Sequence, residues 1–203
     1  QGAVKVFFSY SLSGCSFVPN KYNVIFAFVN QMMMKGPEAG RIQALFDGIA
    51  DDYDKLNHLL SLGVDRTWRR RALKQIVVPG QAQSILDVAC GTGDFSIAIA
   101  RKADIRTVVT GVDLSEGMLA VMDEKVRKAG LDGRIRAEQG NCEMMRFADA
   151  SFDRVTIAFG IRNFEHREAA LTEILRVLKP GGRLVILELS VPSNKFLRWC
   201  YGI

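Results

Sequence analysis

The hydrophobic pattern changes near residue 80, and the change divides the chain into a helical part and a part built around strands. From residue 41 onward, apolar residues recur at three- and four-residue spacing, which is typical of helices with one buried face. The two helical stripes are Ile42, Leu45, Phe46 and Ile49, followed by Tyr53, Leu56, Leu59 and Leu60. A basic helix is predicted next, over 68–76.

Five apolar runs after residue 83 predict strands at 84–90, 107–112, 134–138, 152–159 and 183–189. Helices are predicted between them, with Ser115 as one N-cap and with another helix over 168–178. Runs this continuous are typical of a parallel sheet that is covered on both faces, so we expect an α/β sandwich. In such a sheet the ligand lies beyond the carboxyl ends of the strands, where the strand order reverses.

The first 35 residues carry few charges and show neither a helical nor an alternating period. We therefore expect residues 1–35 to be an atypical extension outside the core. Residues 36–80 are expected to form a helical lid, and residues 81–203 the ligand-binding core.

Composition narrows the class of protein. The chain has 203 residues, of which 48% are hydrophobic and 24% charged, as in one ordinary globular domain. No apolar run is long enough to cross a membrane. The 27 basic and 22 acidic residues give a net charge of +5, but the basic residues are scattered, so we expect no nucleic-acid partner.

Four cysteines, Cys15, Cys90, Cys142 and Cys200, are widely spaced and only two histidines accompany them. This spacing does not fit a metal site, and we expect reduced thiols and a cytoplasmic location.

The strongest chemical signal is the turn Gly91-Thr92-Gly93, where a predicted strand runs into a helix. Small residues let a ligand approach the backbone, although a tight turn alone would also require them. Asp113 ends the next strand, where a carboxylate can accept hydrogen bonds from both hydroxyls of a ribose; a helix-capping role is the alternative. The spacing is not G-x-G-x-x-G, and Asp94 would repel a pyrophosphate, so the pattern favours S-adenosylmethionine over a dinucleotide.

Several stretches together resemble the ubiquinone/menaquinone biosynthesis C-methyltransferases, which are class I methyltransferases with a Rossmann-like fold. The resemblance covers roughly residues 41–203. Its motifs are Leu86-Asp87-Val88-Ala89-Cys90-Gly91-Thr92-Gly93-Asp94, Leu178-Lys179-Pro180-Gly181-Gly182-Arg183, Phe46-Asp47-Gly48-Ile49-Ala50, Tyr53-Asp54-Lys55-Leu56-Asn57, Asp65-Arg66-Thr67-Trp68-Arg69 and Thr156-Ile157-Ala158-Phe159-Gly160-Ile161-Arg162-Asn163.

The resemblance implies methyl transfer from S-adenosylmethionine to a ring carbon of a polyprenylated quinol, either demethylmenaquinol or its benzoquinol counterpart. The residues it places at the cofactor are Asp87, Gly91, Thr92, Gly93, Asp113, Asn141 and Cys142. Asp87 has the alternative role of accepting N–H groups of the turn. Cys142 and Ala158 depart from the family's usual small residue and Ser at those positions. The family's sheet also has two further strands, which we expect this chain to lack.

Arg162 follows the fourth predicted strand, where its guanidinium could stabilise a phenolate or orient a water molecule. Its alternative role is a surface ion pair with Glu165 or Asp153. Tyr53 and His58 precede the sheet: Tyr53 is expected to close the cofactor pocket, and His58 is either a proton acceptor or a packing residue.

Other functions stay open at this point. A class I methyltransferase of another small molecule would share the cofactor site, and so would a non-catalytic binding or assembly subunit. The basic run Trp68-Arg69-Arg70-Arg71 reads first as a solvated helix face; its alternative is peripheral contact with anionic lipid at the inner membrane face. The sequence does not decide whether the protein forms a homo-oligomer.

Overall fold

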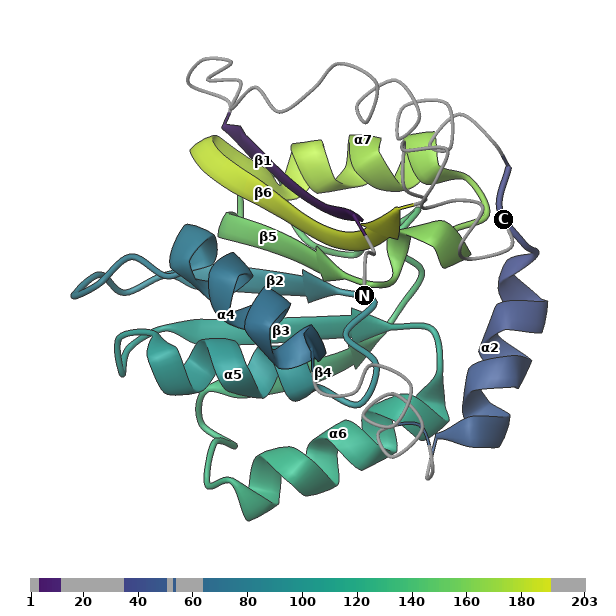
Figure 1. Cartoon of the computed structure of the whole chain (residues 1–203), viewed down its shortest axis with the longest axis horizontal. Helices are drawn as coiled ribbons and strands as arrows, with labels where there is room; N and C mark the ends of the chain where they lie inside the picture. The colour runs from purple at the N-terminus through teal and green to yellow at the C-terminus, as the bar shows by residue number, and fades with distance from the viewer. Residues whose placement is uncertain (1–3, 12–34, 51–52, 54–63, 191–203) are drawn as a thin grey trace.

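The computed structural model describes residues 4–11, 35–50, 53 and 64–190, and it shows one sheet with helices on both faces (Figure 1). The sheet has six strands in the order β1-β6-β5-β2-β3-β4. The strands are β1 (Val4–Ser11), β2 (Ser84–Val88), β3 (Val108–Asp113), β4 (Ile135–Gln139), β5 (Phe152–Ala158) and β6 (Leu178–Ser190). The helices are α2 (Ala39–Ile49), α4 (Val64–Ile76), α5 (Asp94–Lys102), α6 (Glu116–Lys128) and α7 (Arg167–Val177), with a short 3₁₀ turn η1 (Ile161–Asn163).

Alternate residues of the strands pack into two separate hydrophobic cores, one on each face of the sheet, as expected for a sheet that is covered on both faces. Leu86 and Val88 of β2 pack with α7 on one face, whereas Ile85 packs with α4, α5 and α6 on the other. The predicted stripe of α6, Met118, Leu119, Met122 and Val126, is the buried face of that helix. Ser115 is its N-cap, as predicted, and accepts a hydrogen bond from the Met118 N–H at 3.1 Å. The expected parallel α/β sandwich with a Rossmann-like fold is confirmed.

The predicted boundary between α7 and the last strand is wrong. The helix ends at Val177 and the strand begins at Leu178, so Pro180, Gly181 and Gly182 lie within β6 and not in a connecting turn. The pairing of β5 with β6 is irregular between Phe152 and Arg154, and Gly181 adopts a φ of +77° there. A left-handed glycine accommodates such an irregularity without ending the strand.

Residues 4–11 also depart from the expectation for the N-terminal extension. They form β1, which pairs antiparallel with β6 at the edge of the sheet, from Val4 opposite Ser190 to Ser11 opposite Arg183. The expectation that residues 1–35 are an extension outside the core does not include this strand. The division at residues 35 and 80 stays a prediction.

The strand order reverses at β2. From β2 the chain proceeds to β3 and β4 on one side and then returns to β5 and β6 on the other, with all four of these neighbouring pairs parallel. After β2 and β5 the chain therefore leads to opposite sides of the sheet, and a ligand-binding crevice is expected between these two strands at their carboxyl ends. Figure 1 shows α2 beyond that end of the sheet. Among the described residues, no helix is long and apolar enough to cross a membrane.

Candidate functional site

A cleft whose empty space, open solvent included, amounts to about 730 Å³ lies between α2 and the carboxyl ends of the central strands. We call the sheet side of the cleft the floor; it comprises Ala89, Gly91, Asp113, Asn141 and Cys142. We call α2 together with Tyr53 the lid, which contributes Ala39, Ile42, Gln43, Phe46 and Tyr53.

The glycine turn of the floor has the backbone that its sequence predicts. Gly91 and Gly93 adopt φ of +54° and +79°. A Cβ on Gly91 would meet nothing within 4 Å, because the residue faces the cleft, whereas a Cβ on Gly93 would lie 2.4 Å from Met122 Cγ. Gly91 thus lets a ligand approach the backbone, and Gly93 lets the turn pack against α6.

Two residues other than glycine at the cleft also have left-handed backbones. Ala89 and Phe159 follow the neighbouring strands β2 and β5 and have φ of +55° and +63°. Their loops touch closely, since a Cβ on Gly160 would lie 2.6 Å from Ala89 Cβ. Such strain concentrates at functional sites, and residue type alone gave no signal of it.

Asp113 lies on the floor of the cleft, at the end of β3. Its Oδ2 accepts a hydrogen bond from the Gly91 N–H at 2.8 Å, and its Oδ1 accepts one from the Ser115 N–H at 3.1 Å. Burial raises the pKa of this carboxyl, while the backbone N–H groups of Ser115 and Gly91 act against the rise. Each carboxylate oxygen can accept more than one hydrogen bond, so Asp113 keeps capacity for a ligand hydroxyl.

Asn141 and Cys142 complete the floor in the loop after β4. Asn141 Oδ1 accepts a hydrogen bond from the Glu143 N–H at 2.9 Å, which shapes this loop. Cys142 is buried, and burial raises the pKa of its thiol to about 12. Its side chain is therefore a neutral apolar surface at physiological pH. Cys90 and Cys142 are free thiols.

Three residues predicted at the cofactor lie behind the floor and do not line the cleft: Asp87, Thr92 and Gly93. Asp87 is buried, and its Oδ2 accepts a hydrogen bond from Ser96 Oγ at 2.6 Å. Burial raises the pKa of Asp87 to about 7. Asp87 thus ties β2 to the first turn of α5, which is close to its alternative role. Direct contact of these three residues with a cofactor stays a prediction.

Polar contacts fasten the lid at both ends of α2. At its start, the Ala39 N–H donates to Glu165 Oε2 at 3.0 Å. Near its end, Asp47 Oδ1 accepts hydrogen bonds from Ser115 Oγ at 2.5 Å and from the Gly117 N–H at 3.1 Å. No residue of α2 itself is buried, so its apolar face, Ile42 and Phe46, is turned to the cleft and not to a protein core.

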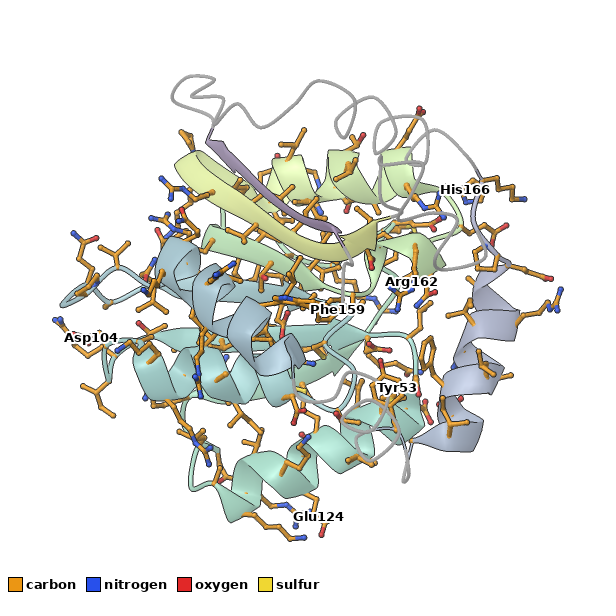
Figure 2. The ribbon with its side chains drawn as sticks, in the orientation of Figure 1. Tyr53, Asp104, Glu124, Phe159, Arg162 and His166 are labelled. Carbon is orange, nitrogen blue, oxygen red and sulfur yellow. The ribbon has the colours of Figure 1, made fainter. Side chains whose placement is uncertain are left out.

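The three predicted catalytic residues differ in where the structure places them. Tyr53 lines the cleft, and its ring packs edge-on against Phe46 with centroids 5.8 Å apart; its role in closing a cofactor pocket stays a prediction. His58 lies outside the described residues. Arg162 lies in η1 after β5 but is not among the residues that line the cleft. Figure 2 shows Arg162 beyond the carboxyl end of β5, on the side where Tyr53 and α2 lie.

The ion-pair partners suggested for Arg162 are wrong. Arg162 Nη1 lies 2.5 Å from Glu188 Oε1 of β6, whereas Glu165 pairs with Lys35 and Asp153 pairs with Lys179. The register of β5 against β6 decides this pairing, and the sequence does not reveal it.

The basic run on α4 is only partly a solvated face. Trp68 is buried, and the Arg69 guanidinium lies over the rings of Phe95 and Phe159, 6.0 and 5.8 Å from their centroids. Arg70 and Arg71 are exposed, as expected of a solvated face. Among the described residues, no group of three His, Cys, Asp or Glu side chains could hold a metal ion.

Known proteins are similar to this chain in sequence. The sequence model of the ubiE/COQ5 methyltransferase family matches residues 32–203. The chain belongs to the ubiE/COQ5 methyltransferase family. It is 48% identical over 159 residues to the demethylmenaquinone methyltransferase of Bacteroides fragilis, covering 78% of this chain and 64% of that protein. It is 50% identical over 162 residues to the ubiquinone/menaquinone biosynthesis C-methyltransferase UbiE of Geobacter sulfurreducens, covering 80% and 63%.

The chain thus spans just under two thirds of the length of these relatives in the ubiE/COQ5 family. Solved structures show the same fold. The cyclase SpnF superposes with a TM-score of 0.65 at 23% identity, covering 76% of this chain and 61% of SpnF. A SAM-dependent methyltransferase from Aquifex aeolicus superposes with a TM-score of 0.56 at 23% identity, covering 63% and 66%. At this identity the likeness concerns the fold alone.

Three residues of the site were missed by sequence reasoning: Asp47, Glu165 and Glu188. Asp47 lies within the Phe46-Asp47-Gly48-Ile49-Ala50 motif, which is the one signal that could have drawn attention to it. Glu165 was considered only as a partner of Arg162. Glu188 interrupts the apolar run of β6 between Leu187 and Leu189, and a carboxylate in that position is an anomaly visible in the sequence.

Proposed function

We propose that this protein transfers a methyl group from S-adenosylmethionine to a ring carbon of a polyprenylated quinol, demethylmenaquinol or its benzoquinol counterpart. The observation that carries the proposal is the position of Asp113, a carboxylate on the floor of the cleft that accepts a hydrogen bond from the Gly91 N–H of the glycine turn. The names of the relatives from Bacteroides fragilis and Geobacter sulfurreducens supply the substrate class.

The residues of the floor fit the proposed cofactor. Asp113 would accept hydrogen bonds from the ribose hydroxyls. Asn141 and the neutral Cys142 would border the adenine, which is flat and largely apolar. The cofactor, when bound, supplies an electrophilic methyl group on a positively charged sulfur.

The chain's own contribution is positioning and charge stabilisation. Ile42, Phe46 and Tyr53 give the cleft an apolar wall on the lid side, which would exclude water and contact the quinol ring. A ring carbon is nucleophilic enough for this reaction only when a neighbouring hydroxyl donates charge, best as a phenolate. Arg162 does not line the cleft itself, but it lies in the turn after β5 between two residues that do, Gly160 and Asn163, and its guanidinium would stabilise that oxyanion.

The proposal is tested by incubating the protein with labelled S-adenosylmethionine and a short-chain demethylmenaquinol. Label is expected in the quinol, with Arg162→Ala lowering kcat by about 10²-fold and changing cofactor affinity less than about twofold. Cofactor binding with labelling of another phenol in place of the quinol would indicate a different small-molecule substrate. Cofactor binding with no labelled product would indicate a non-catalytic subunit.

We also propose peripheral contact with anionic lipid, supported by the exposed side chains Arg70, Arg71 and Lys74 on α4. Sedimentation with vesicles of phosphatidylglycerol is expected to carry the protein down at low salt. The triple exchange of these residues to Gln is expected to leave it in the supernatant. Equal sedimentation of both proteins would overturn the contact.

A further inference from the structure

Glu188 is a buried carboxylate that the proposed reaction does not use. It lies on β6, one residue beyond the last position paired with β5, where Ala158 stands opposite Leu187, and it stands opposite Val6 of β1. Its side chain is 4% exposed, and Leu184, Val185, Ile186 and Leu187 before it are all buried apolar residues. Placing an ionised group at the end of such a strand costs free energy, and a buried ion pair seldom repays that cost in stability alone.

One partner of Glu188 is the guanidinium of Arg162, and this pair is asymmetric; the buried Arg167 also interacts with the charge of Glu188. Glu188 is buried, whereas the side chain of Arg162 is 43% exposed, with Nη1 lying 2.5 Å from Glu188 Oε1. A guanidinium has five N–H donors in a rigid plane, so one bond to a carboxylate fixes its orientation and leaves donors for a second anion.

The backbone of the same turn is held from behind by a second arginine. Arg167 is buried, and it donates to the Ile161 carbonyl at 3.1 Å through Nε and to the Arg162 carbonyl at 2.7 Å through Nη2. The η1 turn is thus fixed through its carbonyl groups, and the Arg162 side chain is fixed at its far end by Glu188. Both restraints act on one residue at the carboxyl end of β5.

We propose that Glu188 is a positioning residue that holds the Arg162 guanidinium where the phenolate oxygen of the substrate binds. The proposal rests on the proposed function, because it needs a phenolic substrate beside Arg162. Gly160 and Asn163, on either side of Arg162 in the sequence, line the cleft, so the pair lies next to it.

The test uses the redox-stable phenol 4-methoxy-1-naphthol, whose ionisation is followed by absorbance when it is bound with S-adenosylhomocysteine. In the unsubstituted protein the pKa of the bound phenol is expected to be lower than in water. Neutralising Glu188 distinguishes two effects of opposite sign. If Glu188 acted through its charge, Glu188→Gln would make the site more positive and lower that pKa further; loss of positioning raises it toward the value in water.

In the transfer assay, Glu188→Gln is expected to lower kcat about tenfold with little change in the KM for S-adenosylmethionine. Glu188→Asp keeps the charge and recovers part of this loss; it also serves if the Gln variant does not fold. The matched control is Asp153→Asn, which breaks the ion pair with Lys179 at 2.9 Å between β5 and β6, at the end of these strands away from Arg162. This control is expected to leave both readouts unchanged.

The outcomes separate this proposal from the proposed function. If Arg162→Ala raises the pKa of the bound phenol and Glu188→Gln does not, the positioning role of Glu188 is overturned while Arg162 keeps its role. If neither variant moves that pKa, the placement of the phenolate at Arg162 is wrong, and both proposals about this end of the cleft fail. A fall in kcat for Glu188→Gln that Asp153→Asn matches would also overturn the positioning role.

Discussion

The floor and the lid face each other across one cleft, but they are built on different principles. The residues of the floor lie at or just after the ends of buried strands. The atoms behind the floor are packed so closely that Gly93 has no room for a Cβ beside Met122. The lid has no buried residue in α2 and is fastened by Glu165 and Asp47 at its two ends. From this difference we propose that the floor is a preformed ligand site and that the apolar face of the lid becomes fully buried only when a ligand binds.

The largest expected effect is a change in the free energy of unfolding with pH, which tests the burial of Asp87 behind the floor. Because burial raises the pKa of Asp87 to about 7 from an ordinary 3.8, the folded chain keeps this proton between about pH 4 and 7 while the unfolded chain releases it. The free energy of unfolding should fall as pH rises through that window, by up to about 4 kcal/mol, and change no further from this source above pH 7. Asp87→Asn should lack this component.

Other carboxyl groups titrate in the same range, so the readout is the difference between the two proteins in denaturant titrations at pH 5 and pH 8. Asp87→Asn should gain stability over the unsubstituted protein at the higher pH. A constant difference between the two proteins at both pH values would contradict a buried, protonated Asp87.

A pair of glycine substitutions compares the two regions directly. Gly93→Ala should lower the free energy of unfolding by about 2 to 4 kcal/mol, because its φ is +79° and the new Cβ would clash with Met122. Gly40→Ala in α2 meets nothing within 4 Å and should be neutral or stabilising by at most about 1 kcal/mol. Equal effects in thermal denaturation would break the contrast between floor and lid.

Asp113→Asn addresses the ligand face of the floor. Loss of a charged acceptor should weaken binding of S-adenosylmethionine by about 2 to 3 kcal/mol, roughly 30- to 150-fold, as measured by calorimetric titration. Asp123→Asn, at an exposed position of α6, is the matched control and should bind as the unsubstituted protein does. If both variants bind alike, Asp113 does not contact the ligand.

The smallest effect concerns the fastening of the lid. Asp47→Ala removes the acceptor of Ser115 Oγ and of the Gly117 N–H, and should speed dissociation of S-adenosylmethionine about 3- to 10-fold in stopped-flow displacement. The melting temperature should hardly change, because α2 buries no residue. Glu38→Ala, at an exposed position that makes no side-chain cap, is the control on the same helix. A large loss of stability without faster dissociation would make Asp47 structural.

The contrast also explains what the sequence could predict. The floor was predictable because its signals lie within short segments of sequence. These signals are the periodicity of the strands, the turn around Gly91 and Gly93, the Ser115 cap and an acidic residue at the end of the next strand. The helix α2 was predicted for the same reason, from the spacing of Ile42 and Phe46.

Contacts between distant segments were not predictable in this way. Asp47 meets Ser115 across 68 positions and Glu165 meets Ala39 across 126, and no local rule selects either partner. The partner of Arg162 was misassigned because strand register, and not closeness in sequence, brings Glu188 to it. The edge strand β1 has apolar residues at alternate positions, Val4, Val6, Phe8 and Tyr10, but this short pattern does not reveal that the strand pairs with β6.

The most direct test of a preformed floor beneath a closing lid is hydrogen exchange of the intact chain with and without S-adenosylmethionine. Amides of β2 and β3 should exchange slowly in both states, whereas amides of α2 should become markedly more protected when the cofactor binds. Binding that leaves the exchange of α2 unchanged, or that first protects β2 and β3, would contradict this account.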